Sequence, residues 1–240
     1  PRPGWSEQDP ADWIRAAETA LDALAAAAPG AMAAVRGIGL SGQMHGATLL
    51  DGADRPLRPC ILWDDVRAHA EAAALDADPR FRSISGNIVF PGFTAPKLLW
   101  VRTHEPDVFA RTRRVLLPKD YLRLWLTGEA ASDLSDASGT SWLDVGARAW
   151  SHALLEASGM SPDQMPRLAE GTDVTGTLRP DVAARWGMPR AVVAGGGGDN
   201  AASAVGVGAG APGTGFVSLG TSGVIFATSP AYAPAPESAV

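Results

Sequence analysis

Hydrophobic and polar positions along the chain follow two rhythms, one typical of amphipathic helices and one typical of buried strands. The first rhythm starts after Asp9 and Pro10, which suit the cap and the first position of a helix. From Trp13 to Leu24, apolar residues recur every three or four positions, so one face of this helix is apolar. The Pro-Gly pair at 29–30 predicts its end.

Strand-like segments follow this helix. The segment 35–40 predicts a buried strand that emerges into a polar loop over 41–46. The segments 47–50 and 59–63 predict two more strands, joined through the Asp-Gly turn at 51–52. This alternation of helix and strand indicates a layered α/β domain.

The middle of the chain is more helical. Helices are expected over 95–104, 119–126, 151–157 and 180–186, and a short strand over 115–117. The segment 131–142 is rich in Ser, Asp and Gly, which predicts a structured excursion on the surface.

The last fifty residues differ in composition, because Asp199 is the only charged residue over 191–236. Glycines interrupt this stretch, so it does not predict a membrane span. The expected elements are a buried strand over 191–194, a glycine loop over 195–198, a helix over 200–205, a small-residue link over 206–215, and hairpin strands over 215–219 and 224–227. A fresh hairpin after a link indicates that a second domain begins there.

Net charge and cysteine count argue against several classes of binding partner. The 240 residues carry a net charge of -6, and no basic stretch marks a nucleic-acid or membrane surface. Cys60 is the single cysteine, which excludes an intramolecular disulfide and a cysteine-based metal cluster. One thiol and no signal peptide or targeting arm favour the cytoplasm. A homodimer is compatible with the sequence, which does not establish the oligomeric state.

Asp199 is the strongest chemical clue. Four glycines precede it, so a ligand can approach the backbone closely, and the carboxylate stands at the start of a helix. Its uncharged neighbours predict desolvation, which makes a carboxylate more basic, as a general base requires. A plain helix cap is the alternative interpretation, and spacing alone does not decide between the two.

The same segment has a rival interpretation. Residues 196–201 match the dinucleotide-binding pattern G-x-G-x-x-A after a strand. That fold needs an acidic residue about 20 positions later, and no acid follows until Glu237. The context therefore argues against a dinucleotide site.

A second glycine turn lies within the expected hairpin. Gly220, Thr221 and Ser222 offer backbone N–H groups and two hydroxyls to an anion, although such turns often only connect strands. With Asp199 as a base, this turn would complete the two parts of a phosphoryl transfer.

Two further places offer sugar-binding chemistry. His45, in the loop after a buried strand, could donate a hydrogen bond to a substrate hydroxyl, and Met44 offers an adaptable apolar wall. Trp63 beside Asp64 combines an aromatic face with a carboxylate. The alternatives are a histidine satisfied locally in its turn and a tryptophan buried in the core.

Several segments resemble the FGGY family of carbohydrate kinases, and the likeness runs through nearly the whole chain in the family's order. They are SGQMHGATLLD (41–51), ILWDD (61–65), PGFTAPKLLW (91–100), LLPKDYLR (116–123), GGDNAA (197–202) and SLGTSG (218–223). The segment QMHG favours xylulose over glycerol or ribulose as the substrate.

This resemblance implies an α/β, actin-like and ribonuclease H-like fold with two lobes, and ATP-dependent phosphorylation of D-xylulose to D-xylulose 5-phosphate in xylose metabolism. Asp199 matches the family's general base. The sugar contacts are implied for Met44, His45, Trp63, Asp64 and Asn200, and the ATP phosphate contacts for Gly220, Thr221 and Ser222. ATP and Mg2+ are the implied cosubstrate and cofactor.

Two departures from the family pattern shape the expected domains. The family begins with an Asp-x-Gly-Thr phosphate loop, which is not found here, and most of its second lobe is not found either. Residues 1–210 are therefore expected to form the sugar-binding lobe without its first strands, and 211–240 the link and first hairpin of the ATP-binding lobe. The chain is interpreted as an excerpt truncated at both ends. A kinase of another ketose or polyol, or a non-catalytic sugar-binding fragment, remains the alternative.

Overall fold

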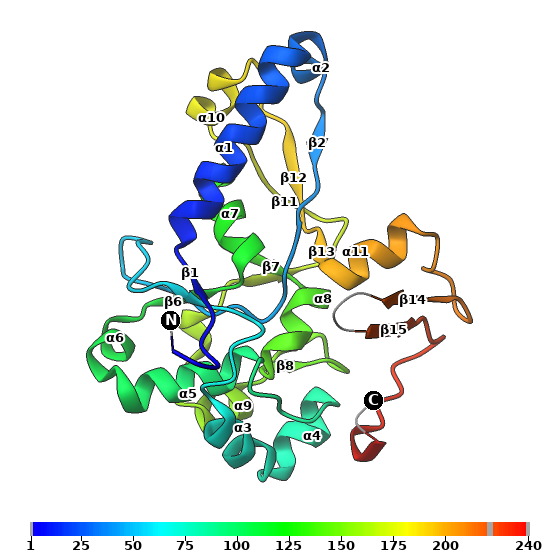
Figure 1. Cartoon of the computed structure of the whole chain (residues 1–240). Coiled ribbons are helices and arrows are strands. Elements are labelled where there is room, and N and C mark those ends of the chain that lie inside the picture. Colours follow the sequence, from blue (N-terminus) through cyan, green and yellow to red (C-terminus); the bar gives the residue numbers. More distant parts are fainter. Residues whose placement is uncertain (1, 220–222, 239–240) are drawn as a thin grey trace.

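Two packed regions, each with its own apolar core, make up the protein (Figure 1). The computed structural model describes residues 2–219 and 223–238. The upper region in Figure 1 holds a small sheet flanked by helices, and the lower region is mostly helical. The mixed α/β class expected from the sequence is confirmed.

The upper region starts with the predicted helix α1 (Pro10–Ala27), where Asp9 Oδ1 accepts a hydrogen bond from Ala11 N at 2.9 Å. Helix α1 ends at Ala27, just before the Pro-Gly pair, as predicted. Proline lacks an N–H and is tolerated in the first turn of a helix, so Pro29 opens a second, short helix, α2 (Pro29–Ala33).

A three-stranded sheet lies beside α1 and forms the middle of this region. Strand β12 (Val192–Ala194) runs parallel to β2 (Gly37–Ile38) and antiparallel to β11 (Val174–Thr177). Helix α10 (Pro180–Arg185) connects β11 to β12 and packs Val182 into the same core.

The lower region contains short strands whose pairing differs from the expected one. Strand β4 (Thr48–Leu50) pairs with β6 (Arg114–Leu116), and β5 (Cys60–Ile61) pairs with β1 (Glu7–Gln8). The two strands expected to be joined through 51–52 share only an isolated bridge, Ala47 to Ile61. Fully buried β4 needs a partner for its backbone, and β6 supplies it from the distant helical segment.

The helices around these strands build the larger core. Phe81, Leu98 and Trp142 are among its buried residues. The helices are α3 (His69–Asp76), α4 (Pro79–Ser85), α5 (Thr94–His104), α6 (Pro106–Arg111), α7 (Pro118–Thr127) and α9 (His152–Ala157).

The segment 131–142 is not the surface excursion that its composition predicts. It forms β7 (Ala131–Asp133), α8 (Leu134–Ala137) and the 3-10 turn η1 (Ser138–Thr140), and most of its residues are buried. Polar residues can occupy the interior here because cationic side chains and backbone groups pair with them.

The remaining elements complete the chain. They are β3 (Ser41–Gly42), β8 (Leu143–Asp144), β9 (Ala149–Trp150), η2 (Pro162–Gln164), β10 (Arg167–Ala169), β13 (Gly197–Gly198), α11 (Asp199–Gly206), β14 (Gly215–Leu219), β15 (Gly223–Ala227) and η3 (Pro236–Ser238). The predicted hairpin is present as β14 and β15, whose apolar Leu219 and Ile225 are each 84% exposed. In the part of the chain described, no helix has the length and hydropathy needed to cross a membrane.

Candidate functional site

Two short parallel strands bring the candidate residues together. Gly197 of β13 lies opposite Ser41 of β3, and Gly198 lies opposite Gly42. The sequence predicts polar and glycine loops at both places, whereas each segment contributes two residues to this ladder. The chain segments after parallel neighbours leave at the same edge, so 43–45 and 199–200 emerge side by side.

Glycine makes the close approach of these segments possible. A Cβ atom at Gly198 would lie 3.0 Å from both Cγ and Sδ of Met44. A Cβ atom at Gly139 would lie well inside contact distance of the His45 ring and 3.0 Å from Met44 Cε. Met44 therefore lies between the Asp199 loop and the turn η1.

Asp199 is the first residue of α11 rather than its cap. Gly198 occupies the cap position, and Asp199 Oδ1 accepts a hydrogen bond from Asn200 N at 2.9 Å. The Asp199 side chain is exposed, so the expected desolvation is wrong for the described chain. No described element covers this carboxylate, which leaves it free to meet a ligand at the helix N-terminus.

A hydrogen-bonded chain from α8 fixes the start of α11. Gly198 N donates to Ser135 Oγ at 3.1 Å, and Ser135 Oγ donates to Asp133 Oδ1 at 2.5 Å. Asp133 also caps α8 by accepting from Ser135 N at 3.0 Å. One side chain thus links the cap of α8 to the residue before Asp199.

His45 is held by contacts from distant parts of the chain rather than by its own turn. Its Nδ1 lies 2.8 Å from the Gly139 carbonyl oxygen, and its ring stacks on Phe93 with centroids 4.6 Å apart. Its backbone has φ of 68°, in the left-handed region that is uncommon for a residue other than glycine.

The contacts of His45 determine its protonation. Burial, with a smaller contribution from the Lys97 charge, lowers the pKa of His45 to about 4, although the Gly139 hydrogen bond and the Asp199 charge oppose the shift. The neutral ring carries its proton on Nδ1, because a carbonyl oxygen can only accept. Nε2 of the neutral ring is then an acceptor, and this arrangement favours accepting a hydrogen bond over the donor role that the sequence predicts for His45.

Trp63 and Asp64 lie beside the same group of loops. Trp63 is 50% exposed, which excludes the alternative of a core tryptophan, and Asp64 is also exposed. The carbonyl of Trp63 packs against Gly92 so closely that a Cβ atom there would clash with it. Phe93 follows Gly92 and stacks on His45, so one loop connects Trp63 to the histidine.

The remaining predicted site residues are Asn200 and the turn at 220–222, and the structure describes only the first. Asn200 is half-buried in the first turn of α11, next to Asp199. Gly220, Thr221 and Ser222 lie outside the described residues, between β14 and β15. The structure therefore brings Met44, His45, Asp199 and Asn200 to one strand edge, with Trp63 and Asp64 on an adjoining loop.

A buried charge cluster around Lys119 lies behind the edge formed by β3 and β13. Lys119 Nζ lies 2.7 Å from Asp120 Oδ1, 2.7 Å from Asp133 Oδ2 and 3.0 Å from Asp136 Oδ2. Burial raises the pKa of Asp136 to about 8, although Lys119 opposes the shift. Burial by itself would lower the pKa of Lys119, but the three carboxylates outweigh it and raise the pKa.

Arg123 connects this cluster to the glycine loop. Its guanidinium donates to the carbonyl oxygens of Ala194 at 2.6 Å, Gly195 at 2.5 Å and Ala131 at 3.2 Å. The loop before Asp199 is therefore fixed by a buried cation, and not by side chains of its own.

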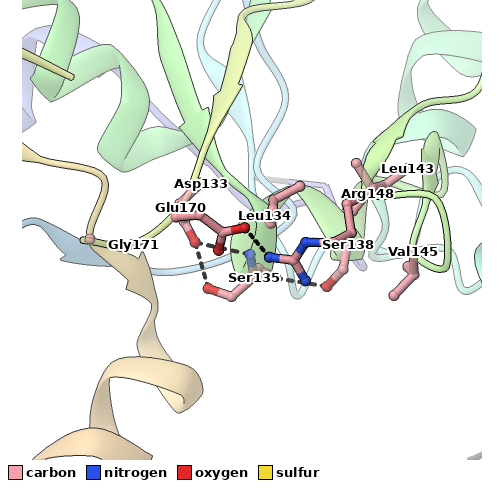
Figure 2. A pocket seen from close by; sticks show the side chains of 10 residues that line it. Asp133, Leu134, Ser135, Ser138, Leu143, Val145, Arg148, Glu170 and Gly171 are labelled. Atoms are coloured by element: carbon pink, nitrogen blue, oxygen red, sulfur yellow. Dashed lines mark hydrogen bonds and ion pairs between the residues drawn. The ribbon is translucent and has the colours of Figure 1, made fainter. Parts of the chain in front are cut away.

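A pocket of about 310 Å³ borders the supporting loops (Figure 2). Ser135 and Asp133 line it together with Arg148 and Glu170, which form an ion pair at its rim. None of the predicted sugar-binding residues lines this pocket. It lies next to their supports and is distinct from the edge where they meet.

Residue patterns did not identify several parts of this site. Phe93, Thr94, Lys97, Ser135 and Gly139 all contact the predicted residues or their backbone. Lys97 gave the clearest signal, since it is a single cation within the apolar run of α5. Ser135 and Gly139 gave none, because their partners lie far away in sequence.

The described residues do not build a metal site. In the ranges 2–219 and 223–238 there is no group of three or more His, Cys, Asp or Glu side chains that could hold a metal ion. The aspartates around Lys119 are paired with a cation instead.

Comparison with known proteins gives consistent matches. A sequence model of the N-terminal domain of the FGGY family of carbohydrate kinases matches residues 1–206. The chain is 57% identical to a xylulose kinase of Klebsiella pneumoniae, covering 100% of this chain and 50% of that protein. It is 55% identical to a xylulose kinase of Escherichia coli, covering 100% of this chain and 49% of that protein.

A solved structure agrees with these sequence matches. The crystal structure of a xyloylose kinase from Brucella ovis superimposes on this chain with a TM-score of 0.98 at 65% identity, covering 99% of this chain and 49% of that one. The chain spans about half the length of the curated relatives it matches.

Proposed function

This chain belongs to the FGGY family of carbohydrate kinases, and from that premise we propose that it is the sugar-binding lobe of a kinase that phosphorylates D-xylulose. The expected actin-like α/β fold is confirmed by its superposition on kinases of this family. We propose the same division as the sequence predicts, with 1–210 as the sugar-binding lobe and 211–240 as the link and first hairpin of the ATP-binding lobe.

The observation that carries the proposal is the parallel pairing of β3 with β13. It places the Met44-His45 segment and Asp199 at one strand edge, where α/β folds bind ligands. Relatives that align over the whole chain are named xylulose kinases, which favours xylulose as the sugar.

Asp199 is proposed as the general base. Its exposed carboxylate takes the proton of the sugar's terminal hydroxyl as that oxygen attacks the γ-phosphorus of ATP. The new O–P bond forms while the bond from the γ-phosphorus to the β–γ bridging oxygen breaks, and ADP leaves with the electron pair. Positioning and charge stabilisation supply most of the catalysis in such a transfer.

The sugar contacts complete the proposal. His45 Nε2 accepts a hydrogen bond from a sugar hydroxyl, and Met44 forms an apolar wall. Trp63 offers an exposed ring to a C–H face, and Asp64 and Asn200 offer polar groups at the rim.

ATP is proposed as the phosphoryl donor, and carbohydrate kinases of this family use it with a divalent metal. Gly220, Thr221 and Ser222 are proposed to contact its phosphates. The described part of the chain has no cluster suited to Mg2+, so we assign no step to the metal.

Replacing the proposed base tests the mechanism. In the whole gene product, Asp199→Asn removes the proton acceptor with little change of shape. We expect xylulose-dependent ADP release to fall by about 10²- to 10⁴-fold, the usual contribution of a general base. Asp163→Asn, an exposed carboxylate in η2, is the matched control and should retain wild-type turnover.

Near-normal turnover by the Asp199 variant would contradict the assignment of the base. The same assay with D-xylulose, D-ribulose and glycerol tests the substrate, because a preference for ribulose or glycerol would overturn the choice of xylulose. Calorimetric titration of D-xylulose into this chain tests sugar binding without turnover.

A further inference from the structure

We propose that Thr94 and Lys97 are positioning residues that hold His45 in its sugar-accepting orientation by donating hydrogen bonds to its main-chain carbonyl. This inference deepens the proposed function and rests on it for the role of the His45 ring.

Both side chains reach one acceptor. Thr94 Oγ1 donates to the His45 carbonyl oxygen at 3.1 Å, and Lys97 Nζ donates to the same oxygen at 3.0 Å. Neither donor is local, since they lie 49 and 52 residues away in sequence. A carbonyl oxygen with two lone pairs is fully satisfied by two donors.

The two hydrogen bonds to the His45 carbonyl stabilise an unfavourable backbone conformation of that residue. His45 has φ of 68°, in the left-handed region that a residue with a Cβ atom adopts only at an energetic cost. Such conformations persist only where the surroundings over-determine them. Two donors that hold the carbonyl in place provide that constraint.

Lys97 also joins two loops. Its ammonium donates to the Gly92 carbonyl at 2.6 Å as well as to His45, and its side chain is fully buried. Burial lowers the pKa of Lys97 to about 7. The residue thus holds the loop of Trp63 and Phe93 against the loop of His45, without any exposed part that would suggest a surface role.

The first turns of α5 hold both ends of the histidine. Phe93, the residue before α5, stacks on the ring, while Thr94 and Lys97 of that helix hold the carbonyl. With the backbone so fixed, Nδ1 reaches the Gly139 carbonyl, and Nε2 is left as the acceptor. A different φ at His45 would move its ring away from the Gly139 carbonyl, and the proton would then no longer be confined to Nδ1.

The test compares Thr94→Val with Thr94→Ser in the 240-residue chain. Valine keeps the shape and removes the donor, whereas serine keeps the donor. Thr103→Val is the matched control, because Thr103 Oγ1 donates to a backbone carbonyl on the same helix, away from the site. Imidazole ¹⁵N chemical shifts report the tautomer of His45, and calorimetry reports the Kd for D-xylulose.

We expect wild type, Thr94→Ser and Thr103→Val to show a single Nδ1–H tautomer and Kd values within about twofold of one another. Thr94→Val should show a mixture of tautomers and a Kd about 5- to 10-fold weaker, equivalent to one lost hydrogen bond. A merely structural role would lower the melting temperature of Thr94→Val without changing the tautomer.

A wild-type tautomer and Kd in Thr94→Val would overturn the inference. If that variant fails to fold, Thr94→Ala removes the same donor and replaces it in both measurements. An Nε2–H or mixed tautomer in wild type also contradicts the proposed orientation. The ¹⁵N measurement needs no sugar. A whole gene product that does not bind D-xylulose would therefore refute the proposed function, while the tautomer of His45 still tests its positioning.

Discussion

At the scale of single residues, the site depends on side chains whose chemistry is set by partners far away in sequence. His45 is neutral and has one acceptor nitrogen because the Gly139 carbonyl occupies the other. Gly139 has room for this contact only because it lacks a Cβ atom. A glycine in η1 therefore determines what a histidine in another loop can bind.

We expect Gly139→Ala to weaken D-xylulose binding by 10-fold or more. The added methyl group would lie within contact distance of Cε1 and Nδ1 of His45 and displace the ring. Calorimetry on the chain measures the effect. Gly206→Ala is the matched control, since a Cβ atom there meets nothing within 4 Å, and its Kd should not change. Equal affinity in the two variants would contradict this role of Gly139.

At the scale of elements, the position of α11 depends on α8 rather than on the glycine loop before it. The cap residue of α11, Gly198, has no side chain, and its N–H is paired with Ser135. Asp133 holds Ser135 in turn, and Lys119 pairs with Asp133. The position of Asp199 thus depends on the buried Lys119–Asp133 ion pair, to which the Ser135 hydroxyl connects the start of α11.

We expect Ser135→Ala to lower the free energy of unfolding by about 1–3 kcal/mol, because it leaves the buried Gly198 N–H without its acceptor. Exchange of the Gly198 amide hydrogen should become at least 10-fold faster. Ser138→Ala is the control, because Ser138 Oγ donates to the Ser135 carbonyl and does not contact Gly198. Unchanged exchange at Gly198 in Ser135→Ala would show that this bond does not fix the helix start.

At the scale of the whole molecule, α7 connects the upper core to a third, smaller apolar cluster at the β4–β6 pair. Trp125 and Leu126 pack into the upper core, while Leu124 packs with Leu50 and Leu116 of the β4–β6 pair. The same helix carries Lys119 and Arg123, whose partners lie on β7, α8 and the loop before β13. A substitution in this buried charge cluster is therefore expected to affect the packing of both regions and the position of the glycine loop before Asp199.

The cluster predicts a pH dependence of stability. The pKa of Asp136 is about 8 in the folded chain against 3.8 as its ordinary value, so the folded state binds the proton more tightly. The stability from this proton is fully present below about pH 4 and is lost as the pH rises through 8. In Asp136→Asn this titration is absent.

We expect the unfolding free energy of wild type, relative to Asp136→Asn, to fall as the pH rises from 4 to 8, by at most about 1.4 kcal/mol per pH unit. Urea unfolding at three pH values within this range measures it. The difference between wild type and Asp163→Asn, an exposed carboxylate, should change little over the same range. A relative gain by wild type would mean that Asp136 is ionised and stabilised by Lys119.

Local sequence predicted most elements correctly. The start of α1, the helices α5 and α7 and the hairpin of β14 and β15 agree with it to within a few residues. Each depends on spacing, capping residues and turn residues, which act between near neighbours. The neighbourhood of Met44, His45 and Asp199 did not follow from local pattern, which left each as a separate candidate, and was implied by the resemblance to the family.

Tertiary structure alone decided the rest. The polar segment 131–142 is buried because Lys119 and Arg123 pair with groups in it and its Ser135 pairs with Gly198, and composition does not reveal such pairing. The sequence by itself determined the elements, the family and the residue types available at the site. Only the fold decided that Asp199 is exposed and that Nδ1 of His45 meets the Gly139 carbonyl, because burial and hydrogen-bond partners arise between segments that the chain order keeps apart.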